Sequence, residues 1–332
     1  MEQRRLGANG PVISSLGVGA LSFSDFYGVT NEGESHAVLD AAREAGVTHI
    51  DTANVYGMGR SENAIGSYLR ANPAARESFV IATKAGISRD ADGNRIFDNT
   101  PKHLEAELDA SLERMGVEAV DLFYVHRRNH DVPIEDVAGA LGRLVEKGKT
   151  RGIGFSEIAP SSLRRAHAVH AVTAVQSEYS LSTRTPEMGL VQTCAELGAA
   201  FVAFSPVGRS YLTDRPLSQE AAQGLAFLKP NPRFNPPHYQ RNIETTDRFR
   251  ALAAEIGEPA AALAIAWVLA QGEHVIAIPG TRSVGHFAEL VRGAEIEMTP
   301  ELLGRIEVIL PVGWAHGERY SADQWVGVER YG

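Results

Sequence analysis

The segment HIDTANVYG (residues 49–57) carries a short apolar run that ends in a carboxylate, and a tyrosine follows five residues later. We predict a buried strand over Thr48–Thr52 and a helix over Glu62–Arg70, joined by a loop. A carboxylate at the edge of a buried core is costly unless a charged or hydrogen-bonding group pairs with it. Asp51 therefore predicts a partner elsewhere in the chain.

The same unit of a strand followed by a helix recurs along the chain. We predict seven further strands, over Val12–Gly19, Phe79–Thr83, Ala119–Val125, Thr150–Phe155, Val172–Gln176, Ala200–Phe204 and Val275–Ile278. Further helices are predicted over Glu34–Ala45, Pro101–Met115, Ile134–Lys147, Ser161–His170, Pro186–Leu197, Thr245–Ile256, Pro259–Leu269 and Val284–Arg292. The starts and stops agree with capping chemistry, in which Thr100 and Ser161 begin helices and four glycines end them: Gly46, Gly116, Gly148 and Gly198.

This alternation predicts a parallel sheet covered on both faces. An open, doubly wound sheet and a closed barrel both fit the pattern, but eight units in about 300 residues favour a (β/α)8 TIM barrel, with the chemistry at the carboxyl ends of its strands. We expect one domain over residues 1–332. Two segments interrupt the rhythm: a proline-rich long loop after strand 7 (208–243), and a C-terminal loop over the barrel mouth (311–332).

Composition narrows the classes of function. A net charge of −9 argues against nucleic acid as a partner, because phosphate binding needs a basic face. The single cysteine, Cys194, indicates a reducing compartment. The amino terminus lacks the apolar core of a signal peptide, and the apolar run 260–270 is too short to span a bilayer. We expect a cytoplasmic protein without a membrane partner, and the sequence leaves open whether it is a homo-oligomer.

Four reactive side chains fall at three consecutive strand ends. Asp51 and Tyr56 follow one strand, Lys84 ends the next in ATKAG, and His126 ends the third in DLFYVHR. An ammonium group lowers the pKa of a neighbouring phenol, a carboxylate holds the ammonium, and an imidazole can orient a carbonyl oxygen. Each residue alone more often caps a helix, faces solvent or fills a core. Together they predict that Tyr56 is a general acid.

The chain resembles the aldo-keto reductase family, and within it the branch of pyridoxal reductases and auxin-induced-protein-like reductases. The resemblance is carried in order by LGVGALSF, HIDTANVYG, ATKAG, YVHR, GIGFSE, VQSEYSL, FSPVGRS and IPGTR. It implies reduction of an aldehyde or ketone with NADPH in preference to NADH and without a metal. It also implies a catalytic set of Asp51, Tyr56, Lys84 and His126.

The resemblance also implies where the cofactor binds. Phe204 would stack on the nicotinamide, Ser156 and Gln176 would bond its carboxamide, and Arg282 would hold the 2′-phosphate. The chain departs from the family at Glu157 and Leu290, where many relatives carry Asn. The full set implied to contact the cofactor is Gly19, Ala20, Asp51, Ser156, Gln176, Phe204, Ser205, Pro206, Val207, Gly208, Arg209, Gly280, Thr281, Arg282, His286 and Glu289.

Aromatic residues of the first loop and the tail suggest a substrate pocket, although they could equally pack the loops onto the barrel. The candidate pocket residues are Phe23, Tyr27, Tyr56, His126, Trp314 and Trp325. The run HRRNHD (126–131) adds positive charge beside the site, so an anionic group on the substrate is conceivable. Two other functions stay open: a Schiff-base lyase using Lys84, and a regulatory subunit that senses a bound nucleotide.

Overall fold

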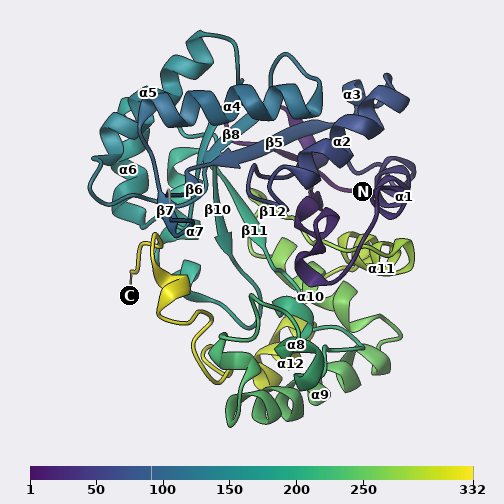
Figure 1. The fold of residues 1–332 in the computed structure, drawn as a ribbon. Helices are drawn as coiled ribbons and strands as arrows, with labels where there is room; N and C mark the ends of the chain where they lie inside the picture. Colours follow the sequence, from purple (N-terminus) through teal and green to yellow (C-terminus); the bar gives the residue numbers. More distant parts are fainter. Residues whose placement is uncertain (91, 332) are drawn as a thin grey trace.

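Eight parallel strands form the centre of the molecule (Figure 1). The computed structural model describes residues 1–90 and 92–331, so Gly332 of the predicted tail lies outside the described residues. The strand order is β12-β11-β10-β9-β8-β5-β4-β3. Their bounds are β3 (Val18–Gly19), β4 (His49–Asp51), β5 (Val80–Ala85), β8 (Leu122–Val125), β9 (Ile153–Ser156), β10 (Ala174–Glu178), β11 (Ala200–Phe204) and β12 (Val275–Ala277).

The sheet closes on itself between its first and last strands. A parallel bridge joins Leu16 to Ala277, and the N–H of Gly17 donates to the carbonyl of Ala277 at 2.8 Å. Glycine is required at this seam, because a Cβ on Gly19 would lie 2.5 Å from the carbonyl oxygen of Ile278. Closure confirms the predicted (β/α)8 barrel and excludes the open sheet.

Helices follow the strands and surround the barrel. The main ones are α1 (Glu32–Glu44), α2 (Arg60–Ala71), α4 (Pro101–Met115), α5 (Ile134–Glu146), α6 (Pro160–Val169), α7 (Leu190–Leu197), α9 (His238–Glu255), α10 (Ala260–Leu269), α11 (Val284–Arg292) and α12 (Pro300–Ile309). All four predicted glycine stops adopt a left-handed backbone, with φ between 67° and 73°. Ser161 does not cap α6, because that helix begins one residue earlier, at Pro160.

The predicted strand over Val12–Gly19 is two separate strands. β1 (Gln3–Arg5) and β2 (Val12–Ser14) form an antiparallel hairpin, and the chain then turns into β3. Leu6 and Ile13 of this hairpin segment are fully buried against the side chains that fill the barrel interior. The hairpin therefore contributes to the barrel core rather than to its wall.

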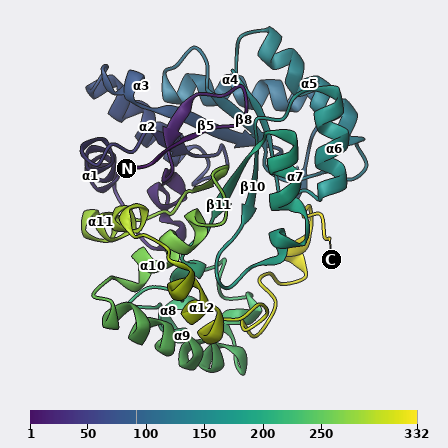
Figure 2. The same cartoon turned by 180° about the vertical axis from the view of Figure 1, so that it is seen from behind.

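Two segments lie outside the alternation of strands and helices that builds the barrel. A hairpin of β6 (Ile87–Arg89) and β7 (Arg95–Phe97) follows β5, and periodicity did not predict it. The proline-rich segment 208–243 contains only short helices, α8 (Gln219–Gln223) among them, until α9 begins at His238. Both views place α8, α9 and α12 together, on the side of the barrel away from α4 and α5 (Figures 1 and 2).

No single helix in the described part of the chain is long and apolar enough to cross a membrane. Only α9 and α10 taken together reach that length and composition, and they are bent by 92°. Every residue of α10 is buried in the protein.

Candidate active site

Asp51 and Lys84 form a buried ion pair at the carboxyl ends of neighbouring strands. Asp51 ends β4 and pairs in register with Ala82 of β5, so Lys84, two residues on, rises on the same inner face. The two residues are 2% and 0% exposed. The Lys84 ammonium donates to an Asp51 oxygen and to the carbonyl of Thr52, the latter at 2.8 Å.

The second oxygen of Asp51 accepts a hydrogen bond from Gln176 Nε2 at 2.7 Å. Both carboxylate oxygens are therefore satisfied, one by a charge and one by an amide. This is the partner set that a desolvated carboxylate needs. The sequence predicted Lys84 as the partner of Asp51, but not Gln176, which comes from β10 across the barrel.

Tyr56 and His126 complete the group. The Tyr56 hydroxyl accepts a hydrogen bond from Lys84 at 3.1 Å, and the ammonium lies 4.8 Å from the centre of the phenol ring. The His126 ring meets the Tyr56 ring edge-on, with centroids 5.7 Å apart. The four side chains predicted from three strand ends thus converge in one place.

The pKa of Tyr56 moves in the opposite direction from the one predicted. Burial raises the pKa of Tyr56 above its ordinary value, and the charge of Lys84 offsets that rise only in part. Burial alone would lower the pKa of Lys84, but Asp51 and Tyr56 raise it on balance. At neutral pH the site therefore holds a protonated phenol beside a charged ammonium.

His126 is a neutral imidazole in this setting. Burial, followed by the charges of Lys84 and Arg127, holds the pKa of His126 well below its ordinary value. Its Nδ1 is buried without a hydrogen-bond partner among the described residues. A neutral ring carries one N–H, so it can donate a single hydrogen bond to an oxygen placed beside Tyr56.

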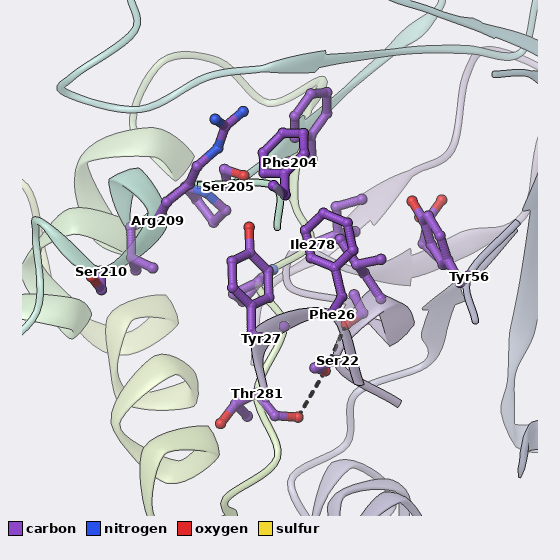
Figure 3. Close-up of a pocket in the computed structure, with 18 of the residues that line it drawn as sticks. Ser22, Phe26, Tyr27, Tyr56, Phe204, Ser205, Arg209, Ser210, Ile278 and Thr281 are labelled. Atoms are coloured by element: carbon purple, nitrogen blue, oxygen red, sulfur yellow. Dashed lines mark hydrogen bonds between the residues drawn. The ribbon is translucent and has the colours of Figure 1, made fainter. Parts of the chain in front are cut away.

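A cavity of about 1050 Å³ opens above these residues. Figure 3 shows Phe26, Tyr27 and Phe204 among its walls, with Tyr56 on one side and Arg209 and Ser210 on the other. The residues predicted for catalysis, cofactor or substrate that line it are Gly19, Tyr27, Asp51, Tyr56, His126, Ser156, Gln176, Phe204, Ser205, Pro206, Val207, Arg209, Gly280, Thr281, Arg282, His286 and Glu289.

Three predicted pocket aromatics lie elsewhere. Phe23 is buried in the core at 1% exposure. Trp314 also packs in the core, where its indole N–H donates to the carbonyl of Leu181 at 2.7 Å. Trp325 packs edge-on against Tyr320 and beneath the guanidinium of Arg319, so it supports the cavity wall from behind. Ala20 and Gly208 also lie off the cavity lining, and Lys84 sits beneath it.

Several lining residues were missed, above all on the β6–β7 hairpin and its neighbours. Ile87, Arg95 and Phe97 reach the cavity from the hairpin. Arg127 reaches it from the exit of β8 and belongs to the run HRRNHD, which was predicted to add positive charge beside the site. The sequence held a signal for the hairpin, because DADGN (90–94) separates two short runs rich in β-branched and aromatic residues. In the tail, Gln324 was missed, whereas Tyr320 is one of the aromatic residues that suggested a pocket wall.

A buried network of charges fastens the tail to the barrel. Arg319 binds Glu157, which follows β9, and Glu178, which ends β10; Arg209 also binds Glu178, at 2.6 Å. Despite burial, Arg319 and Arg127 lower the pKa of Glu157 to about 2. The guanidinium charge of Arg209 is therefore already paired inside the protein.

Comparison with known proteins gives one consistent result. The sequence profile of the Aldo/keto reductase family matches residues 15–311. The chain is 36% identical over 317 residues to a probable aldo-keto reductase 1 of Glycine max, covering 95% of this chain and 91% of that one.

Solved structures of similar fold are also aldo-keto reductases. The glycerol dehydrogenase AKR11B4 of Gluconobacter oxydans superposes with a TM-score of 0.81 at 26% identity, over 93% of this chain and 94% of that one. The aldo-keto reductase AKR11C1 of Bacillus halodurans, in its holo form, has a TM-score of 0.76 at 24% identity, over 98% and 99% of the two chains, and shows the same fold.

Replacing one member of the buried pair tests its energetics. We expect Lys84→Met to lower the free energy of unfolding by about 3–5 kcal/mol, because Asp51 is left charged and buried. The control is Lys147→Met, which removes an exposed pair with Glu105 and should cost less than about 1 kcal/mol. Urea unfolding measures both. The double variant Asp51→Asn with Lys84→Met should recover part of the loss, whereas strictly additive losses would contradict the pairing.

Proposed function

This chain belongs to the aldo/keto reductase family of nicotinamide-dependent oxidoreductases, and from that premise we propose that it reduces an aldehyde or ketone to the alcohol with NADPH. One observation carries the proposal: Tyr56, Lys84, Asp51 and His126 meet at a cavity large enough for a dinucleotide and a small substrate. The substrate is a small carbonyl compound.

The lining of the cavity fits a nicotinamide cofactor. Phe204 offers an aromatic face beside Ser156 and Gln176. The Gln176 N–H2 group is held by Asp51, which leaves its oxygen to accept from a carboxamide. When bound, the reduced nicotinamide supplies a hydride to the carbonyl carbon.

The loop after β11 suits the phosphates through its backbone rather than through Arg209. Val207 has φ −97° and ψ 20°, and Gly208 follows at φ 59°. A right-handed residue followed by a left-handed one is the backbone pattern of an anion-binding nest, and here the Gly208 N–H already donates to the carbonyl of Ser205 at 2.9 Å. Ser205 and Arg209 are also left-handed without being glycine, and such backbone strain clusters at functional sites.

The protein side of the proposed reaction uses the contacts described above. Tyr56 gives its proton to the substrate oxygen as negative charge develops there, and it recovers a proton from solvent afterwards. Lys84 stabilises the phenolate left behind, because its ammonium already bonds the hydroxyl. His126 donates one hydrogen bond that orients the carbonyl, and Asp51 keeps the ammonium charged and fixed.

Arg282 supports a preference for NADPH over NADH. It precedes α11, whose first turn is capped by Ser283, and it lines the cavity together with His286 and Glu289. The Arg282 guanidinium donates to the carbonyl of Val29, and this hydrogen bond holds the side chain near the start of α11. A planar guanidinium at a helix amino terminus suits a 2′-phosphate.

The other two functions have less support. A Schiff-base lyase needs an uncharged lysine, whereas Asp51 and Tyr56 raise the pKa of Lys84. A regulatory nucleotide sensor does not need the four converging side chains. We also propose a cytoplasmic location, in keeping with a single cysteine, Cys194, which is buried.

Tyr56→Phe tests the proton donor. We expect turnover to fall by about 10²–10⁴-fold with NADPH binding largely retained, because only the transferable proton is removed. A panel of aldehydes and ketones, followed by the absorbance of NADPH and of NADH, measures activity, and fluorescence titration measures binding. If no carbonyl compound accelerates oxidation of NADPH by the wild type, the result would favour the alternative function, a regulatory subunit that senses a bound nucleotide. Unchanged turnover in the variant would show that the proton comes from another group.

Arg282→Ala tests the choice of cofactor. The dissociation constant for NADPH should rise by about tenfold or more, because a charge-assisted hydrogen bond to phosphate is lost. The constant for NADH should change little, and fluorescence titration gives both values. Equal effects on the two cofactors would place Arg282 away from the 2′-phosphate.

A further inference from the structure

Two arginines that the catalytic scheme does not use line the same cavity as Tyr56 and His126. Arg127 directly follows His126 at the exit of β8, and Arg95 begins β7 of the hairpin after β5. Arg127 is among the charges that oppose the rise in the pKa of Tyr56, and it adds to burial and Lys84 in lowering the pKa of His126. Its guanidinium therefore lies within electrostatic reach of the reacting groups.

Neither arginine is neutralised by an ion pair with another described residue. One Arg127 nitrogen donates to the Tyr320 hydroxyl at 3.1 Å, while Nη1 is buried and bonds to nothing in residues 1–90 and 92–331. Arg95 is an exposed residue that donates to the backbone carbonyl of Asp323, and desolvation of part of its side chain and the charge of Arg127 lower its pKa. An unpartnered buried N–H of a charged group costs free energy that a ligand can recover.

The nearby carboxylates do not remove this excess of positive charge. Glu157 acts on Arg127 at a distance, but its oxygens already accept from Arg319, from Ser177 and from the N–H of Glu178. Asp323 is exposed, so solvent screens its attraction for Arg95.

The position of the pair separates it from the phosphates of the cofactor. Around the closed barrel, β5 lies four strands away from β11, and β8 lies four strands away from β12. With eight strands in all, each of these pairs lies on opposite sides of the barrel. The loops proposed to hold the phosphates follow β11 and β12, whereas Arg95 and Arg127 follow β5 and β8. Figure 1 likewise shows the β6–β7 hairpin and α11 on opposite sides of the barrel. The cofactor phosphates do not explain these two cations.

We propose that Arg127 and Arg95 form an anion subsite, and that the carbonyl substrate carries a carboxylate or phosphate group on the side away from the cofactor. The inference rests on the proposed reductase function and specifies its substrate class. A guanidinium fork matches the planar geometry of a carboxylate and also binds phosphate. Phe97 and Tyr320, whose rings lie 5.4 and 5.8 Å from the Arg95 and Arg127 guanidinium carbons, provide apolar walls for the rest of the molecule.

The same contacts allow a purely structural role, in which both arginines only fasten the tail to the hairpin. Arg127 binds Tyr320 and Arg95 binds the backbone at Asp323, and both partners belong to the tail. The two roles differ in their dependence on charge. Tyr320→Phe removes the tail bond to Arg127 and keeps the cation, whereas Arg127→Met removes the cation and keeps much of the side-chain volume.

A pair of substrates that differ in charge tests the proposal. Meta-carboxybenzaldehyde and its methyl ester present the same aldehyde with and without an anion. We expect the wild type to favour the acid in kcat/KM and this preference to weaken with salt. Arg127→Met should reduce the ratio of acid to ester by about tenfold or more, while Arg127→Lys should retain part of it. Tyr320→Phe should keep the ratio.

The controls separate the subsite from the reductase itself. Arg89→Met removes an exposed arginine of the same hairpin, off the cavity lining, and should leave the ratio unchanged. Calorimetric binding of the acid and the ester to the NADP⁺ complex, where no reduction occurs, should show the same dependence on Arg127. Reduction of both aldehydes with a ratio that Arg127→Met does not alter would overturn the subsite and leave the reductase standing. Loss of the ratio in Tyr320→Phe would assign the arginine to the tail instead.

Discussion

The buried ion pair between Asp51 and Lys84 is the interaction on which the rest of the site depends. It ties the ends of β4 and β5 together, and through Gln176 it reaches β10 across the barrel. Desolvating two charges costs several kcal/mol per ion, and good geometry with every remaining polar atom satisfied is what offsets that cost. The same ammonium bonds Tyr56, so the phenol is positioned by a group that the barrel itself holds rigid.

Burial has a second effect on this centre, because it keeps the proton on Tyr56. The sequence suggested that Lys84 would lower the phenol pKa, yet the loss of water around the ring outweighs the attraction of the ammonium. In the proposed reaction this balance suits a proton donor, since Tyr56 would stay protonated until charge develops on the substrate oxygen. Lys84 would then act on the phenolate that forms, rather than on the resting phenol.

Features repeated along the chain could be predicted from the sequence, and features made by distant segments could not. The barrel followed from eight strand-and-helix units, and the convergence of Asp51, Tyr56, Lys84 and His126 from their places at successive strand ends. Aromatic character did not reveal which face of a loop a ring occupies, so Phe23 and Trp314 were placed in the pocket and lie in the core. The pairing of Arg209 with Glu178 could not be predicted either, because the two residues belong to different segments of the chain.

The position of the C-terminal tail also could not be predicted from the sequence, because it depends on charged residues from three parts of the chain. Arg319 joins Glu157, which follows β9, to Glu178, which ends β10, and this pairing brings Tyr320 and Gln324 to the cavity. The cavity is thus divided between loops after β11 and β12 on one side and the hairpin, the β8 exit and the tail on the other. In the proposed arrangement, separate sets of charges would recognise the cofactor and the substrate.

The charge on Lys84 is directly measurable by nitrogen NMR of the lysine side chain across a pH titration. Asp51 and Tyr56 raise the pKa of Lys84, so the Lys84 signal should remain that of an ammonium past the ordinary lysine pKa of about 10.4. The stabilisation by the pair is then fully present below that pH and is lost as pH rises through the raised pKa. A neutral Lys84 amine near pH 7 would contradict this account of how the site is held together.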